Sequence, residues 1–358
     1  MSSIEMFTRL TGEAAQLRTR LEGFTRQATT GLRAEKLGDL SAEVPRAVSL
    51  RGEIGRREVY GRVMDQALGR AAVTQDSLLR LTEIARAFRT QAATRLNSGD
   101  PGSLMTVQGN ARAALTEVAQ LLNTRHAGEY LFGGSDTGRP PIPDPLGLAT
   151  GQMAQDIAAE VAGLAVNGAY ATLDATRGIA QSTAPGLTPF SDFLTADEAL
   201  PPGLREARRG VPAADGLVIG YGIAAHRNTD ALSTGETTGS WSRDLMRNLM
   251  SLAALTPAQM SEPGAFDTFV GKIREGLSSA EVALGEEAGS LGLVEARMET
   301  ARRRHGDLSA TLAKQLASIE EVDVADALTR MQATRTTLEA SYRAISSLSD
   351  LNLANFLR

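Results

Sequence analysis

The stretch most suggestive of chemistry is Gly-Tyr-Gly-Ile-Ala-Ala, residues 220–225, which fits the loose G-x-G-x-x-A fingerprint of dinucleotide-binding sites. Such a site needs a strand before the fingerprint and a helix directly after it, because the helix N-terminus holds the pyrophosphate. Here the following residues, 226–236, read HRNTDALSTGE and carry no helical period of apolar residues. The pattern therefore favours a glycine-containing strand, and we expect no cofactor.

Other residue types that could carry chemistry are scattered along the chain. The segment GAFDTFVGKI (264–273) fails as a phosphate-binding loop, because its glycines are seven apart and no Ser or Thr follows Lys272. His126, His226 and His305 fall in no common motif, and the absence of cysteine excludes disulfides, thiol chemistry and cysteine-based metal sites. His305 is predicted to be a partly buried core residue, with a proton switch as the alternative. We expect no catalytic or metal-binding residue and no enzyme.

Composition points instead to packed helices. Hydrophobic residues make up 42% of the 358 residues but aromatic residues only 4%, which is typical of the thin core between helices. The net charge of −5 provides no basic field for nucleic acid. Glu5 and Glu13 stand where a cleavable signal peptide would be basic and apolar, so none is expected. No uncharged apolar run approaches the ~18 residues of a membrane span.

Both ends of the chain carry apolar residues at alternating spacings of three and four, the seam of a coiled coil. The first seam consists of Phe7, Leu10, Ala14, Leu17, Leu21, Phe24 and Ala28, and Gly31 is predicted to end its helix. A second seam consists of Tyr60, Met64, Ala67, Ala71, Thr74, Leu78, Leu81, Ala85, Phe88 and Ala92. The break at NSGDPGS (97–103) predicts that a third helix starts near Ser103 and reaches about Arg125.

The C-terminal part mirrors this arrangement. A long seam starts at Phe266 and continues through Val270, Ile273, Leu277, Ala280, Leu284, Leu291, Val294, Met298, Ala301, Leu308, Leu312 and Ile319. Its phase changes within residues 318–327, which predicts a hinge before a last helix. The apolar residues of that helix are Val324, Leu328, Met331, Leu338, Tyr342 and Ile345. Stripes this long are buried most simply by packing the two ends of the chain against each other.

The middle of the chain is heterogeneous and rich in proline. It contains one predicted helix at 152–166 and one predicted strand at 216–225, for which residues 130–132 are a candidate partner. We therefore expect a mainly α fold: a long antiparallel helical hairpin, or coiled-coil rod, formed by both chain ends, with a small mostly-β (α+β) domain inserted at its tip. The expected segments are 1–45 (N-terminal helix and joint), 46–134 (first half of the rod), 135–240 (variable outward-facing tip), 241–320 (second half of the rod) and 321–358 (C-terminal helix).

Three motifs resemble the bacterial flagellin family. RQATTGLRAEKLGDLS (26–41) is similar to the segment that follows the family's first helix, and SIEEVDVADALTRMQATRTTLEASYRAISSL (318–348) is similar to its C-terminal joint and final helix. LLNTRHAGEYLFGG (121–134) looks most like the hook-associated members of the family. Residues 38–47, GDLSAEVPRA, depart from the family's usual acidic motif, and 135–240 match nothing in it.

The resemblance implies an extracellular, self-assembling subunit of the bacterial flagellum, which joins hook to filament as a ring. It implies export through the flagellar type III apparatus without cleavage, and an export chaperone that binds the C-terminal helix. The implied partners are copies of the chain itself, a neighbouring hook-associated protein and flagellin, without nucleic acid or membrane. A filament-forming flagellin is the alternative within the family, and a helical coiled-coil adaptor is the alternative outside it.

The terminal helices are the predicted assembly interface. Residues 1–40 carry six basic and five acidic side chains, and residues 322–358 carry four of each, so identical copies can lie side by side without strong repulsion. The apolar residues also continue to the chain end, which solvated tails rarely show. The predicted interface residues are Phe7, Leu10, Leu17, Leu21, Phe24, Leu328, Met331, Leu338, Tyr342, Ile345, Leu348, Leu353 and Phe356.

Overall fold

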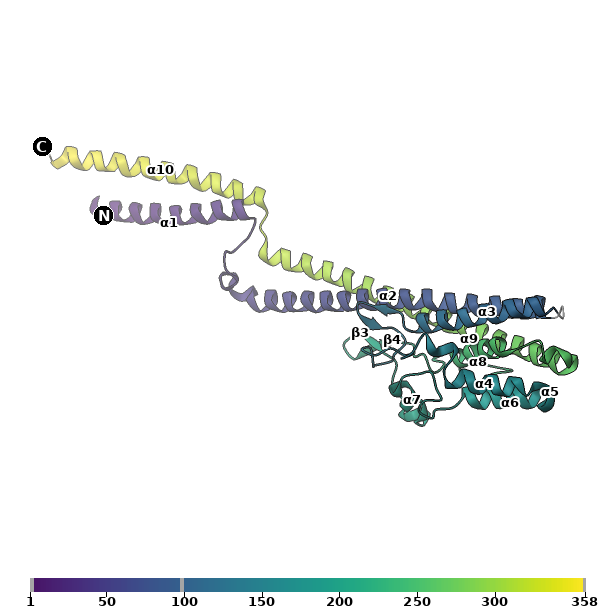
Figure 1. Ribbon diagram of the computed structural model, residues 1–358. Helices are drawn as coiled ribbons and strands as arrows, with labels where there is room; N and C mark the ends of the chain where they lie inside the picture. Colours follow the sequence, from purple (N-terminus) through teal and green to yellow (C-terminus); the bar gives the residue numbers. More distant parts are fainter. Residues whose placement is uncertain (1–2, 97–99, 357–358) are drawn as a thin grey trace. The chain divides into compact units, whose positions relative to one another are not determined.

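The computed structural model describes residues 3–96 and 100–356, which form long helices and two small antiparallel sheets (Figure 1). The predicted fold class, mainly α with a small β region, is confirmed. The helices are α1 (Ser3–Thr30), α2 (Val44–Arg95), α3 (Pro101–Leu122), α4 (Gln152–Ala162), α5 (Leu164–Asn167), α6 (Ala169–Ala180), α7 (Asp192–Ala199), α8 (Trp241–Ala254), α9 (Pro263–Glu320) and α10 (Val324–Phe356). The strands are β1 (Arg125–His126), β2 (Glu129–Tyr130), β3 (Gly210–Ala214) and β4 (Leu217–Gly220), and short 3-10 turns occur at Leu37–Glu43, Gly147–Ala149, Pro202–Leu204 and Gln259–Ser261.

The chain divides into two compact units. The terminal unit consists of residues 1–59 and 304–358, and the central unit consists of residues 60–303. Both boundaries fall inside long helices, α2 and α9, so each of these helices contributes to both units.

In the central unit, α2 and α9 run antiparallel, and ion pairs between them set their register. Arg86 Nε lies 2.8 Å from Glu281 Oε1, and Arg302 Nη1 lies 2.9 Å from Asp65 Oδ1. The two predicted seams face the core here, with the exception of half-buried Tyr60 and Ala301. The buried seam residues are Met64, Ala67, Ala71, Thr74, Leu78, Leu81, Ala85, Phe88, Ala92, Phe266, Val270, Ile273, Leu277, Ala280, Leu284, Leu291, Val294 and Met298.

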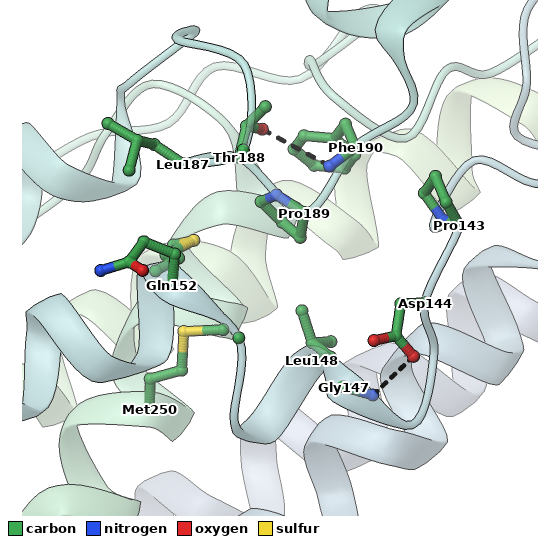
Figure 2. A pocket seen from close by; sticks show the side chains of 13 residues that line it. Pro143, Asp144, Gly147, Leu148, Gln152, Leu187, Thr188, Pro189, Phe190 and Met250 are labelled. Carbon is green, nitrogen blue, oxygen red and sulfur yellow. Dashed lines mark hydrogen bonds between the residues drawn. The ribbon is translucent and has the colours of Figure 1, made fainter.

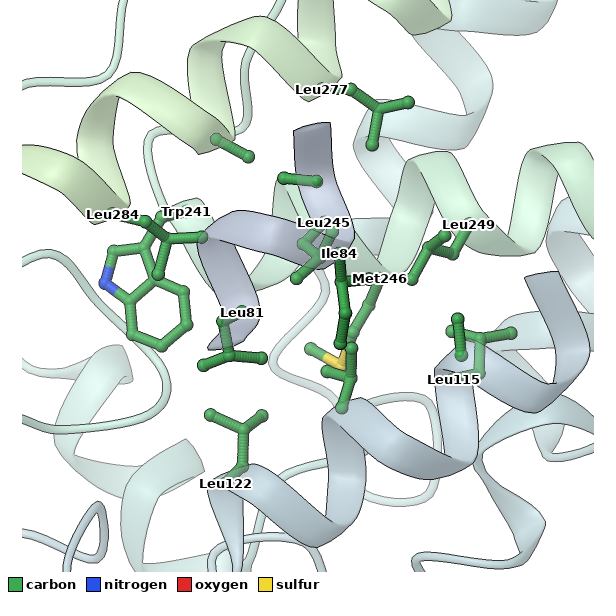
Figure 3. Close-up of a cluster of buried hydrophobic side chains, with 14 of the residues drawn as sticks. Leu81, Ile84, Leu115, Leu122, Trp241, Leu245, Met246, Leu249, Leu277 and Leu284 are labelled. Carbon is green, nitrogen blue, oxygen red and sulfur yellow. The ribbon is translucent and has the colours of Figure 1, made fainter. Parts of the chain in front are cut away.

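Helix α3 completes one side of this core. Its start is set by Asp100, whose carboxylate accepts hydrogen bonds from the Gly102 and Ser103 amides at 3.2 and 2.8 Å, and by Pro101 at the first helical position. Leu115 and Leu122 of α3 point into the same apolar cluster as residues of α2, α8 and α9 (Figure 3).

Helix α8 lies at the centre of the unit, and every side chain from Trp241 to Ala253 is buried. Trp241, Leu245 and Leu249 face the apolar cluster in Figure 3. The burial extends to two arginines of this helix, Arg243 and Arg247, which are 2% and 1% exposed. Both arginines are paired with carboxylates: Arg243 with Glu198, and Arg247 with Glu236 at 2.8 Å.

The 135–240 segment contains more helix than strand. The predicted helix at 152–166 corresponds to α4 and α5, whereas α6 and α7 were not predicted. The strand predicted at 216–225 is shorter, and its main partner is β3 rather than residues 130–132: β4 pairs with β3, with Val211 opposite Ile219. The candidate partner segment meets the end of the predicted strand through the Gly133–Ala224 bridge and the 2.9 Å bond from the Ala225 amide to the Phe132 carbonyl.

The loop before α8 is fastened to α9 by a buried carboxylate. Glu287, 1% exposed, accepts hydrogen bonds from the amides of Thr229, Asp230 (3.2 Å) and Ala231 (3.3 Å). Burial raises the pKa of Glu287, although these three amides oppose the shift. The loop 226–240 is therefore held by contacts with residues nearly 60 positions away in sequence.

None of the helices in the part of the chain that the structure describes is both long and apolar enough to cross a membrane.

Candidate assembly surface

Helices α1 and α10 form an antiparallel pair in the terminal unit. Figure 1 shows them side by side, with the start of α1 next to the end of α10. At the other end of the pair, the residues just after α1 and just before α10 are joined by a β-bridge between Leu32 and Glu321. The Arg33 amide donates to the Glu320 carbonyl at 2.7 Å, and the Val322 amide donates to the Gly31 carbonyl at 3.0 Å. These bonds fix where the two helices begin to run together.

Local signals set both helix ends at this joint. Gly31 adopts a φ of 69°, a left-handed conformation that ends α1 as predicted. Helix α9 ends at Glu320 and α10 starts at Val324, which confirms the predicted break within 318–327. The carboxylate of Asp323 caps α10 by accepting from the Ala325 amide at 2.8 Å.

A small apolar cluster lies beneath the joint. Ala47 and Leu50 of α2 and Ile319 of α9 are buried together, with Leu37, Leu40, Leu312 and Leu316 packed around them. Arg51 of α2 also pairs with Glu320 at 2.9 Å. The joint is thus a packed structure in its own right.

The interior of the α1–α10 pair is thin. Its fully buried residues among those described are two alanines and one leucine: Ala14 (3% exposed), Ala327 (0%) and Leu338 (7%). Leu10, Leu17, Leu21, Phe24, Met331 and Ile345 are half-buried. A pair of this length that buries so few large side chains leaves most of its apolar stripe in contact with water.

Three of the predicted interface residues lie outside this seam. Phe7 is 37% exposed, Leu328 is 41% exposed and Tyr342 is 50% exposed. The residues of α10 that face α1 at these points are Ala327 and Ser341. Leu328 and Tyr342 each come one residue later, so the seam predicted from large apolar residues is displaced by one position there. Other large apolar side chains exposed in this unit include Met6, Leu32 and Val324.

The side chains of the last three predicted residues, Leu348, Leu353 and Phe356, lie outside those that the structure describes, although their backbone belongs to α10.

Ion pairs form within each helix of the pair. In α1 the pairs are Arg9–Glu13 at 3.1 Å and Arg18–Glu22 at 3.2 Å, and in α10 they are Arg330–Asp326 at 2.9 Å and Arg335–Glu339 at 3.1 Å. All are exposed, so they contribute little to stability. They leave the apolar side chains between them as the features most able to bind a partner.

Two of the histidines identified in the sequence, His226 and His305, are buried in the fold. His305 is buried (5% exposed), as predicted. His226, 1% exposed, lies 3.0 Å from Asp197, and burial together with the Arg227 charge lowers its pKa to about 4. His226 is therefore neutral near neutral pH. Residues 226–240, which follow the glycine fingerprint, are not helical, so the helix that a dinucleotide site needs is missing there.

A hollow of about 190 Å³ lies in the central unit where residues 143–151 and 186–190 meet Met250 of α8 (Figure 2). Proline, leucine and methionine side chains form much of its wall, and its single acid, Asp144, accepts a 2.8 Å bond from the Gly147 amide. Its lining brings together no acid–base pair of the kind that catalysis needs. The α1–α10 surface remains the better candidate for function.

Comparison with protein families identifies the two ends of the chain. A family model described as the bacterial flagellin N-terminal helical region matches residues 4–137, and one described as the bacterial flagellin C-terminal helical region matches residues 275–357. Together these matches cover more than half of the chain and include α1, α10 and the joint between them. Comparison with individually curated proteins gives no match.

Proposed function

Because the chain belongs to the bacterial flagellin family, and so is a structural subunit of the extracellular flagellum, we propose that it forms the junction between hook and filament. In this role it resembles hook-associated protein 3. The subunit is exported through the flagellar type III apparatus without cleavage, and a chaperone holds α10 until export.

The observation that carries the junction role is the segment LLNTRHAGEYLFGG (121–134), which resembles the hook-associated members of the family. In this chain it comprises the end of α3 and the β1–β2 hairpin, whose turn at Ala127 and Gly128 has φ values of 51° and 85°. Arg125 also stacks over the Tyr130 ring across the hairpin, 4.4 Å from its centroid. The motif therefore forms the end of a helix and a tight hairpin in the central unit.

We infer that the subunits assemble as a ring through α1 and α10. The buried Leu338 and the half-buried seam residues Leu10, Leu17, Leu21, Phe24, Met331 and Ile345 hold the two helices together. The exposed residues Phe7, Leu328 and Tyr342 contact neighbouring copies, because the α1–α10 pair by itself leaves these large apolar side chains in water. Leu348, Leu353 and Phe356 extend the same interface towards the chain end. One face of the ring meets a neighbouring hook-associated protein and the other meets flagellin.

Seeded assembly of the purified chain distinguishes a junction protein from a filament flagellin. A flagellin grows because it repeats one head-to-tail contact without limit, whereas a junction protein needs two different axial faces. We expect the purified chain not to extend its own seeds into long filaments. In cells, it should remain with hook–basal bodies after filaments are sheared off. Long filaments of this chain alone would identify it as a flagellin.

Tyr342→Asp is expected to abolish assembly while leaving the subunit folded. Tyr342 is 50% exposed, so a carboxylate there is solvated in the monomer. At an interface the same carboxylate would be buried without a partner, at a cost of several kcal/mol per subunit. Cells should then release flagellin into the medium, while circular dichroism of the monomer stays unchanged.

Two other variants on α10 serve as controls for this experiment. Tyr342→Phe keeps the apolar ring and should support attached filaments. Leu338→Asp replaces a side chain that is 7% exposed, so it should reduce the helix content of the monomer as well as assembly. If cells that carry Tyr342→Asp still build attached, full-length filaments, this face of α10 is not part of the interface.

A further inference from the structure

A pocket of about 370 Å³ in the central unit lies between α2, the β1–β2 hairpin and β3. Val63 and Ala67 of α2 and Val211 and Pro212 of β3 form part of its apolar wall. Its polar side chains include Arg70 and Arg209. A volume of this order, with apolar walls and a few polar groups, is typical of sites for small molecules.

Two arginines in this pocket share one carboxylate. Arg70 Nη1 lies 2.8 Å from Glu129 Oε2, and Arg209 Nη1 lies 2.9 Å from the same oxygen. Arg70 is 5% exposed and also donates to the Tyr130 carbonyl, so its position is fixed. The Arg209 side chain is 34% exposed and uses one nitrogen, Nη1, for the contact with Glu129.

The charge of the pocket is therefore not balanced. Among the residues that line it, all of which the structure describes, Glu129 is the acid and Arg70 and Arg209 are the two permanent cations. Burial lowers the pKa of Arg70, and the neighbouring Arg209 charge lowers it further, which reflects the repulsion between the two guanidinium groups. A bound anion would relieve this repulsion.

The hairpin also positions His126 in the pocket wall. A Cβ on Gly69 of α2 would lie 3.5 Å from both Cε1 and Nε2 of the His126 ring, so the ring packs directly over the helix backbone at this glycine. His126 thus lies at a fixed place in the wall and can report on whatever occupies the pocket.

We propose that this pocket, the Arg70–Arg209 pocket, binds a small molecule through its oxyanion, a carboxylate or a phosphate group. The planar guanidinium of Arg209 supplies two parallel N–H donors, the geometry that matches both oxyanions. Arg70 adds a second positive charge in a partly desolvated site, where charge interactions are stronger than in water. The site lies in the central unit and does not depend on the junction role.

The test follows the His126 imidazole resonance by NMR while the full-length monomer is titrated at constant pH and ionic strength. The probes are succinate and inorganic phosphate, with chloride as the reference for simple screening. The chain has three histidines, so His226 and His305, both buried, serve as internal references. We expect a saturable shift of His126 with at least one oxyanion and none with chloride.

Arg209→Gln should weaken this binding about tenfold to a hundredfold, the usual effect of losing a charged hydrogen bond. The matched control is Arg208→Gln, because Arg208 is the neighbouring, similarly exposed arginine but pairs with Asp230 at 2.6 Å and does not line the pocket. Gln66→Glu, at an exposed position in the lining, should also weaken binding by adding a negative charge. Unchanged Trp241 fluorescence verifies that each variant is folded.

No saturable shift with either oxyanion, or an equal response to chloride, would overturn the proposal. So would binding by Arg209→Gln that is as tight as binding by the unmodified chain.

Discussion

Leu291→Asp is expected to lower the free energy of unfolding of the central unit by about 4 kcal/mol or more. Leu291 belongs to α9, is 0% exposed and is part of the main apolar cluster. An aspartate there leaves a cavity and buries a carboxylate that has no partner, and both effects reduce stability. Urea unfolding followed by Trp241 fluorescence measures the loss, because Trp241 is 0% exposed in the same cluster.

Leu293→Asp is the matched control. Leu293 lies two residues further along α9 but is 66% exposed, so the same substitution should change the unfolding free energy by only about 0.5 kcal/mol. Equal losses for the two variants would mean that α9 is oriented differently in the core.

Arg247→Ala is expected to cost the central unit about 3–5 kcal/mol, the usual effect of removing one partner of a buried ion pair. Arg247 of α8 is 1% exposed and lies 2.8 Å from Glu236. It also donates to the Leu173 carbonyl at 2.7 Å and to the Thr176 hydroxyl at 3.1 Å, both in α6. Alanine would leave Glu236 and these two acceptors with fewer partners inside the protein.

Arg177→Ala provides the comparison, because Arg177 pairs with the same carboxylate at 2.7 Å but its side chain is 30% exposed. Water can replace part of its contact, so the loss should be about 1 kcal/mol. A loss as large as that of Arg247→Ala would show that burial does not decide the strength of this pair.

The stabilisation by Arg247 should also depend on pH. Burial alone would raise the pKa of Glu236, but hydrogen bonds and charges from Arg177 and Arg247 outweigh it and lower that pKa. A carboxyl group with a lowered pKa stabilises the fold above its unfolded pKa of about 4.3 and loses this contribution as the pH falls through the folded pKa. The difference in stability between the unmodified chain and Arg247→Ala should therefore shrink below about pH 4.

The sequence by itself determined the long helices and the core-facing side of those in the central unit. Met64 through Ala92 and Phe266 through Met298 follow a local period that only a helix can bury on one side, and Gly31 and Asp323 end or begin helices through their own backbone and side-chain geometry. These signals act within a few residues, so they can be read without knowing the rest of the fold. The apolar stripes of both terminal helices are local signals of the same kind.

Tertiary structure alone decided which α10 residues face α1. The seam there runs through Ala327 and Ser341, whereas the larger Leu328 and Tyr342 lie beside it and are exposed. The sequence gives the period of a helix, but its rotation about its axis depends on how closely the partner approaches, and small residues allow that approach. Side-chain size therefore did not identify which positions of α10 face α1.

Tertiary structure also decided the burial of α8. Arg243 and Arg247 look like a solvated face until Glu198 and Glu236 are brought to them from 45 and 11 residues away in sequence. The pairing of β4 with β3 follows instead from a local signal that the sequence prediction missed: the Asp215–Gly216 turn, with Gly216 at a φ of 76°, joins the two strands directly. The burial of α8, in contrast, depends on contacts between segments whose approach no local pattern specifies.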